Sequence, residues 1–291
     1  MRFAKGHGTG NDFVILPDPD GRLGLTADLV ARLCDRRMGL GGDGVLRAVR
    51  CAADGDPWAQ RATGLGAEWF MDYRNADGGV AEMCGNGIRV FARYLLDNGL
   101  AAGPDLLIGT RAGARVVREG DGCLTTEMGP ATVTGTASAE LGGRHLDGLV
   151  ISVGNPHLAC VVDDPVAGYD LSRAPDLPRE VFPGGANLEV LRVTAGRHAE
   201  MRVYERGSGV TLSCGTGAVA AAVAAAVAAG EWESGTEPAW TIDVPGGRLT
   251  VTPSATASWL SGPAVIVAAG ELDEAWLRAP AARLPALAGA G

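Results

Sequence analysis

Residues 215–229 (GTGAVAAAVAAAVAA) place the strongest restriction on how this chain can fold. Their pattern predicts a helix that ends at Gly230, with valines at helical spacing at Val219, Val223 and Val227. This helix has almost no polar face, and a helix that is apolar on every side must be surrounded by protein. Its apolar run, residues 218–229, is too short to cross a bilayer, which takes about 20 residues. The sequence therefore predicts a central helix enclosed by sheet.

Two other segments have strong helical spacing: residues 27–37, with Thr26 as N-cap, and residues 86–96. Short apolar segments, separated by Gly, Pro and Asp, alternate along most of the remaining chain. We expect these to be strands, at residues 3–5, 12–16, 45–51, 68–73, 116–118, 149–153, 159–162, 188–193, 199–205, 240–244, 249–252 and 264–268. Many strands around few helices predict an α+β fold.

Two helices are preceded by the same motif, Cys-Gly-x-Gly, at Cys84 and at Cys214. This weak internal repeat predicts two pseudo-symmetric domains, each a mostly antiparallel sheet or barrel wrapped around a central helix. We place the boundary near residues 118–122, which gives residues 1–120 plus 264–291 for the first domain and 121–263 for the second. The final strand, 264–268, would return to the first domain. The tail, residues 280–291, has no readable pattern.

Composition excludes several classes of function. Lys5 is the only lysine, so chemistry that needs a lysine Schiff base, as with pyridoxal phosphate, is improbable and we expect no cofactor. A net charge of −9 without a basic tract argues against nucleic-acid binding. The N-terminus lacks the apolar core of a signal peptide, and the cysteines lack metal-ligand spacing. We therefore expect a cytoplasmic protein without a metal site or membrane partner.

Cys84 and Cys214 are the candidate catalytic residues. A cysteine at a helix N-terminus lies among unpaired N–H groups and the positive end of the helix dipole, so we expect its pKa to fall below the usual value of about 8.5. Two such sites facing each other would offer N–H donors to a carboxylate and two thiols to opposite faces of one carbon. One thiolate would remove the α-proton while the other thiol supplies a proton. The motif pair therefore indicates stereoinversion.

Other polar clusters are less specific. His157, in Gly-Asn-Pro-His, is either a buried core histidine or a neighbour that polarises a thiol. Glu205 and Arg206 form either a solvated surface pair or a grip for ammonium and carboxylate groups. We interpret residues 18–20 and 163–164, which are rich in Asp, as exposed turns that hold no metal.

These motifs together resemble the diaminopimelate epimerase family over nearly the whole chain. The resemblance rests on residues 6–14 (GHGTGNDFV), 75–78 (NADG), 84–89 (CGNGIR), 154–157 (GNPH), 205–209 (ERGSG) and 214–217 (CGTG). It implies a homodimeric, cofactor-independent enzyme of lysine and peptidoglycan biosynthesis. Such an enzyme interconverts LL- and meso-2,6-diaminopimelate in the cleft between two similar domains.

The resemblance also implies roles for individual residues. Cys84 and Cys214 would be the acid/base pair, assisted by His157 and Glu205. The substrate's amino and carboxylate groups would be held by Asn11, Asn75, Asn155, Asn187, Glu205 and Arg206. Donors to the carboxylate at the reacting carbon would be Gly85, Asn86, Gly215 and Thr216. The remaining cysteines, at 34, 51, 123 and 160, would be packing residues.

Two positions depart from the family pattern. Many members have Gln at Gly44, and members usually have Glu at Val210, four residues before Cys214. The departures leave open a related racemase or epimerase for another amino acid. A thiol-based redox protein and a non-catalytic binding protein are alternatives from other classes, and inactivation by a disulfide between the two cysteines is an expected side reaction.

Overall fold

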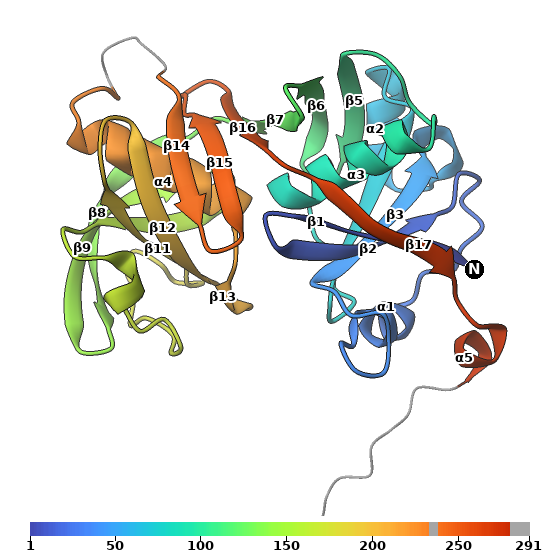
Figure 1. The fold of residues 1–291 in the computed structure, drawn as a ribbon, viewed down its shortest axis with the longest axis horizontal. Helices are drawn as coiled ribbons and strands as arrows, with labels where there is room; N and C mark the ends of the chain where they lie inside the picture. The colour runs from blue at the N-terminus through green and yellow to red at the C-terminus, as the bar shows by residue number, and fades with distance from the viewer. Residues whose placement is uncertain (233–237, 280–291) are drawn as a thin grey trace, which may run out of the picture.

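The computed structural model describes residues 1–232 and 238–279, so the tail at 280–291 lies outside the described residues. Two bodies lie side by side, each with one long helix inside a wrapped sheet (Figure 1). The helices are α3 (Gly85–Asp97) and α4 (Gly215–Ala228). Both were expected from the sequence, with bounds that differ by one residue at one or both ends.

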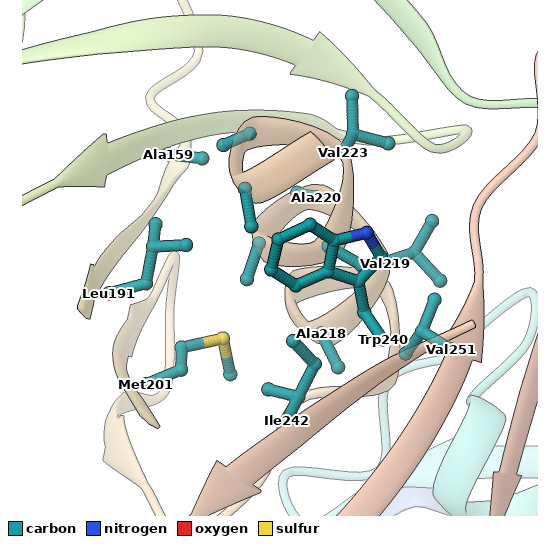
Figure 2. Packing of buried hydrophobic residues seen from close by; sticks show 14 of the residues in the cluster. Ala159, Leu191, Met201, Ala218, Val219, Ala220, Val223, Trp240, Ile242 and Val251 are labelled. Atoms are coloured by element: carbon teal, nitrogen blue, oxygen red, sulfur yellow. The ribbon is translucent and has the colours of Figure 1, made fainter. Parts of the chain in front are cut away.

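Helix α4 lies in the centre of an apolar core. Its residues are buried from Gly217 to Ala226, and the surrounding strands contribute Leu191, Met201 and Trp240 (Figure 2). Alanine and valine side chains are short, so the sheet approaches the helix closely on all sides. The expectation that this apolar helix is enclosed by protein is confirmed.

The first half of the sheet wraps α3. Its strands pair in the spatial order β17, β1, β2, β3, β4, β5, β6, β7, and the β2–β3 and β4–β5 pairs are parallel whereas the others are antiparallel. The strands are β17 (Val265–Glu271), β1 (Arg2–Gly8), β2 (Asn11–Pro17), β3 (Gly44–Arg50), β4 (Trp69–Asn75), β5 (Asp105–Thr110), β6 (Gly113–Gly120) and β7 (Cys123–Gly129).

The second half of the sheet wraps α4 with the same pattern of directions. Its order is β8, β9, β10, β11, β12, β14, β15, β16, with β10–β11 and β12–β14 parallel and the others antiparallel. The strands are β8 (Thr132–Leu141), β9 (Arg144–Ser152), β10 (Pro156–Val161), β11 (Asn187–Val193), β12 (His198–Glu205), β14 (Trp240–Val244), β15 (Gly247–Thr252) and β16 (Ser258–Gly262). The short β13 (Gly209–Thr211) pairs with the end of β12. The repeat in the sequence is thus a repeat in topology.

The two halves are joined through one antiparallel pair, β7 with β16. Leu124 of β7 packs into the core around α3, and Met128 of the same strand packs into the core around α4. Within the described residues the strands therefore form one open sheet with edges at β17 and β8, so that of the expected sheet or barrel around each helix the structure has the sheet. The mostly antiparallel α+β architecture is as expected.

Several local elements differ from expectation. Helix α1 (Ala27–Cys34) begins after Thr26 as predicted but stops short of Arg37, because Asp35 Oδ1 accepts the N–H groups of Arg37 and Met38 and turns the chain. Two short helices were not expected, α2 (Pro57–Gly64) and α5 (Glu274–Arg278).

Asp18 is a further correction, because it is not an exposed turn residue. Its carboxylate is buried and lies 2.8 Å from Arg47 Nε of β3. It also accepts the backbone N–H groups of Arg22 and Leu23. Asp18 is therefore a structural counter-charge inside the first half of the molecule.

Candidate active site

Cys84 and Cys214 occupy equivalent positions, each as the N-cap of its central helix. The Sγ atom of Cys84 accepts the N–H of Gly87 at 3.4 Å, and Sγ of Cys214 accepts the N–H of Gly217 at 3.4 Å. Both cysteines have extended backbone geometry, which is normal for an N-cap residue. The Cys-Gly-x-Gly motif therefore forms the same local structure twice.

The two helix N-termini meet in the middle of the molecule. A Cβ atom on Gly215 would lie 3.2 Å from Cα of Gly85, so the absence of a side chain allows this close approach. Asn86 also crosses from one half to the other, and its Nδ2 donates to the carbonyl oxygen of Ser213 at 3.2 Å. The residues next to the two cysteines are therefore in direct contact, although they are far apart in sequence.

Asn11 and Asn86 surround Cys84. Cys84 Sγ lies 3.5 Å from Oδ1 of Asn11, and the same oxygen accepts Nδ2 of Asn86 at 3.3 Å. The pKa of Cys84 is raised to about 11, mainly by burial and to a smaller extent by the nearby Glu205 carboxylate, against the lowering effect of the Gly87 N–H. Cys84 is thus a protonated thiol at neutral pH.

Cys214 is bordered by residues from three segments. Its Sγ lies 3.5 Å from Oγ1 of Thr216 and 3.8 Å from Nδ2 of Asn187. Burial, followed by repulsion from Glu205 and Glu189, raises the pKa of Cys214 well above its ordinary value. Our expectation of lowered thiol pKa values was therefore wrong for both cysteines, because burial outweighs the helix N-terminus.

His157 lies in a buried pair with Glu189, a residue that the sequence reasoning missed. Nδ1 of His157 is 2.7 Å from Oε1 of Glu189, and both side chains are fully buried. Nε2 of His157 lies 3.0 Å from Oδ1 of Asn155, whose Nδ2 donates to Thr216 Oγ1 at 3.4 Å. A glutamate between apolar neighbours, in residues 188–191 (LEVL), was the available signal, because a buried charge needs a specific partner.

Glu205 is the last residue of β12, and Arg206 follows it directly. The Glu205 carboxylate accepts the hydroxyl of Thr211, and burial raises its pKa although that hydrogen bond opposes the shift. The backbone N–H of Arg206 donates to Oδ1 of Asn187 at 2.9 Å, while the Arg206 side chain is exposed. The segment that holds both residues is therefore linked to Cys214, because Asn187 accepts the Arg206 N–H and its own NH₂ group faces the Cys214 sulfur.

Asn75 is the outlying member of the expected set. It lies exposed at the end of β4, and no hydrogen bond joins its side chain to another residue in the described part of the chain. Most of the other expected residues form two connected groups: Asn11 and Asn86 with Cys84, and Asn155, Asn187, Glu205 and Thr216 with Cys214 or His157. Arg206 joins the second group through its backbone N–H, and Gly85 and Gly215 contact each other between the groups.

The arrangement offers two thiols, buried carboxylates and two helix N-termini around one place in the molecule. Helix N-termini bind anions, and a substrate carboxylate is the natural anion for them. Across residues 1–232 and 238–279, no group of three His, Cys, Asp or Glu side chains has an arrangement suited to a metal ion. Nor does this part contain a helix that is long and apolar enough to cross a membrane. Proton transfer at a carbon beside a carboxylate is the chemistry that this set of groups fits.

Solved structures share this fold. A phenazine biosynthesis protein of the PhzF family from Bacillus anthracis superposes with a TM-score of 0.68 at 17% identity, covering 94% of this chain and 98% of that chain. A hydroxyproline epimerase from Agrobacterium vitis gives a TM-score of 0.64 at 14% identity, covering 93% and 91%. The chain therefore shares its α+β fold with these two proteins.

Sequence comparison gives the family. The model of the diaminopimelate epimerase family matches residues 3–134 and 149–271. A diaminopimelate epimerase from Thermobifida fusca (strain YX) is 59% identical over 280 residues, 96% of this chain and 100% of that protein. One from Mycolicibacterium smegmatis is 48% identical over 300 residues, 97% of this chain and 100% of that protein. The chain belongs to the diaminopimelate epimerase family.

Proposed function

We propose that this protein is an isomerase that interconverts LL- and meso-2,6-diaminopimelate without a cofactor. The observation that carries the proposal is the pair of cysteine N-caps on helices whose first glycines, Gly85 and Gly215, are in contact. Family membership supplies the substrate, because the relatives named diaminopimelate epimerase align over nearly the whole chain. The reaction belongs to lysine and peptidoglycan biosynthesis.

In the proposed mechanism the thiolate of one cysteine takes the α-proton of the substrate. The electron pair of the broken C–H bond stays on the α-carbon, beside a carboxylate bound by N–H groups at the helix N-termini. The thiol of the other cysteine then donates its proton to the opposite face of that carbon. Atoms and charge balance, since one thiolate becomes a thiol and the other thiol becomes a thiolate.

High thiol pKa values are compatible with this cycle. Glu205 has a raised pKa and lies beside Cys214, so it is a suitable group to accept the thiol proton when substrate binds. The buried His157 would assist Cys214 through a chain of hydrogen bonds, in which Asn155 links His157 to Thr216 beside the thiol. Gly85, Asn86, Gly215 and Thr216 would donate to the carboxylate at the reacting carbon, and Asn11, Asn75, Asn155, Asn187, Glu205 and Arg206 would hold the rest of the substrate.

The test is solvent deuterium incorporation at the α-carbon, measured by NMR with LL- and meso-diaminopimelate in D₂O. We expect exchange and epimerisation by the native enzyme, and loss of epimerisation by at least about 10³-fold in Cys84→Ala and in Cys214→Ala. Cys123→Ala is the matched control, because Cys123 lies at the start of β7 and is assigned no chemistry. Full turnover by either active-site variant would overturn the two-base mechanism.

A second candidate is a racemase or epimerase for another amino acid, favoured by Val210 and Gly44. Val210 lies exposed on β13 where family members usually have a carboxylate. A Cβ at Gly44 would lie 2.4 Å from the carbonyl oxygen of Arg74, so the backbone here excludes a side chain. A panel of monoamino and diamino acids, scored by deuterium uptake, separates the two candidates.

We also propose two domains, residues 1–120 plus 264–291 and residues 121–263. The pairing of β17 with β1 supports the return of the chain to the first domain.

A homodimer is the proposed assembly, supported by the edge strand β17, which exposes Val265 and Val267. The cytoplasm is the proposed location, because a mechanism with two free thiols needs a reducing compartment.

A further inference from the structure

The amide of Asn11 lies between a carboxylate and a candidate catalytic thiol. Its Nδ2 donates to Oδ2 of Asp43 at 2.7 Å, and its Oδ1 lies 3.5 Å from Sγ of Cys84. An ionised carboxylate has no hydrogen to donate, so only the NH₂ end of the amide can face it. The carbonyl end must therefore face the sulfur.

We propose that Asp43 is a positioning residue of this site, which holds the carbonyl oxygen of Asn11 on Cys84 and so keeps a hydrogen-bond acceptor beside that thiol. The contact is a property of the fold, and its catalytic use rests on the proposed function. Asp43 lies in the turn before β3 and is not among the site residues expected from the sequence.

The orientation of Asn11 is fixed from its other side as well. Nη2 of Arg89 donates to Oδ1 of Asn86 at 2.9 Å, which leaves the Asn86 NH₂ group to donate to Asn11 Oδ1. A guanidinium has only donors, so this amide cannot reverse either. Arg89 is fully buried and forms no ion pair with a carboxylate in residues 1–232 and 238–279. The Nη1 and Nη2 donors of Arg89 are therefore bound by Gly85 and Asn86 beside Cys84, and not by a carboxylate.

Asp43 is itself held in place by basic and backbone groups. Nη2 of Arg36 lies 2.8 Å from Asp43 Oδ1, and the backbone N–H of Asp12 donates to Asp43 Oδ2 at 3.2 Å. Arg36 also binds Asp12, which pairs with Lys5 at 2.6 Å. The single lysine of the chain therefore belongs to the support of this carboxylate.

The second thiol has the opposite arrangement. Oδ1 of Asn187 accepts the backbone N–H of Arg206, a group that can only donate, so Nδ2 of Asn187 faces Cys214. Cys84 thus faces an amide oxygen, and Cys214 faces an amide NH₂ group. An acceptor beside Cys84 favours its thiol form, and a turned Asn11 amide would favour the thiolate.

The test measures alkylation of Cys84 by iodoacetamide, followed by mass spectrometry of its peptide, between pH 6 and pH 10 in the full-length protein. The variants are Asp43→Ala, Asn11→Ala and the double variant. We expect Asp43→Ala to speed alkylation of Cys84 about fivefold and to move its midpoint to lower pH, because the freed amide can turn its NH₂ group to the sulfur.

Loss of the Asp43 charge by itself would change Cys84 alkylation in a way that can be distinguished from an effect through Asn11. Glu205, Arg89 and Tyr73 also face Cys84, and removing a nearby carboxylate lowers a thiol pKa by itself. That effect would persist without Asn11, whereas an effect through Asn11 would disappear. We therefore expect Asp43→Ala to change the rate by less than about twofold in the Asn11→Ala background. Equal effects in the two backgrounds would overturn the proposal.

Two further measurements separate this proposal from the proposed function. Asp97→Ala is the control variant, because it removes an exposed carboxylate that pairs with Arg93 and should leave Cys84 alkylation unchanged. Thermal melting establishes that each variant is folded. If the native enzyme fails to exchange the α-proton of diaminopimelate, the proposed function fails, while the coupling between Asp43 and Asn11 is still read from alkylation alone.

Discussion

Oε1 of Glu189 lies 2.7 Å from Nδ1 of His157, and neither side chain has any exposed surface. The second carboxylate oxygen of Glu189 is buried without a hydrogen-bond partner in the described part of the chain. A Cβ placed on Gly217 would lie 2.7 Å from Oε1 of Glu189 and 3.4 Å from Sγ of Cys214, so this buried charge is next to the thiol. Glu189 therefore pairs with His157 and also raises the pKa of the Cys214 thiol.

The first prediction concerns Glu189→Gln. Glutamine keeps an acceptor for His157 but removes the negative charge that raises the pKa of Cys214. We expect the pH midpoint of Cys214 alkylation to move to lower pH, because the thiolate is no longer repelled. Glu200→Gln on β12 is the control, since Glu200 pairs with Arg192 away from the thiol. An unchanged Cys214 midpoint in Glu189→Gln would contradict the assigned electrostatics.

The second prediction concerns helix glycines. Gly217→Ala would place a methyl group 2.7 Å from Glu189 Oε1, and we expect it to lower the free energy of unfolding by about 1–3 kcal/mol. Gly64→Ala in α2 meets nothing within 4 Å, so it should raise stability by about 0.5–1 kcal/mol. Urea denaturation measures both. The same sign of change for the two variants would refute the packing argument.

The third prediction concerns the acid stability that Asp12 contributes. Burial raises its pKa, but hydrogen bonds and ion pairs from Arg36 and Lys5 dominate and lower it to about 2. Its contribution, about 1–2 kcal/mol, is present above the unfolded-state pKa of about 4 and is lost as pH falls toward 2. Unfolding free energies of the native protein and Asp12→Asn should differ at pH 6 and converge at low pH. A constant difference would show that the ionised form is not responsible.

The fourth prediction concerns assembly. Val267 is 56% exposed on the edge strand β17, and an unpaired apolar edge is a surface suited to a second copy of the chain. We expect Val267→Glu to convert a dimer to a monomer in sedimentation velocity. Val161→Glu, at an exposed valine in the other half, should leave the dimer intact. A monomeric native protein would overturn the proposed homodimer.

Local patterns were sufficient for the parts of the fold that depend on neighbouring residues. The all-apolar segment at 215–229 predicted an enclosed helix because no polar face was available for solvent. Each Cys-Gly-x-Gly motif predicted a cysteine at a helix N-terminus, and in the structure each cysteine is the N-cap, which is a contact within one helical turn. The two motifs, read together, also indicated a repeated fold and two thiols at one site.

Only the tertiary structure decided the electrostatics of that site and the residues that support it. The sequence predicted lowered thiol pKa values from the helix N-termini, whereas burial and the carboxylates of Glu205 and Glu189 raise them. Desolvation depends on everything packed around an atom, so it cannot be read from one segment. Asp43 hydrogen-bonds to Asn11, which lies beside Cys84, and Arg89 hydrogen-bonds to Asn86, which donates to Asn11. The cysteines were visible in the sequence because their motif is local, while their surroundings are built from strands distant along the chain.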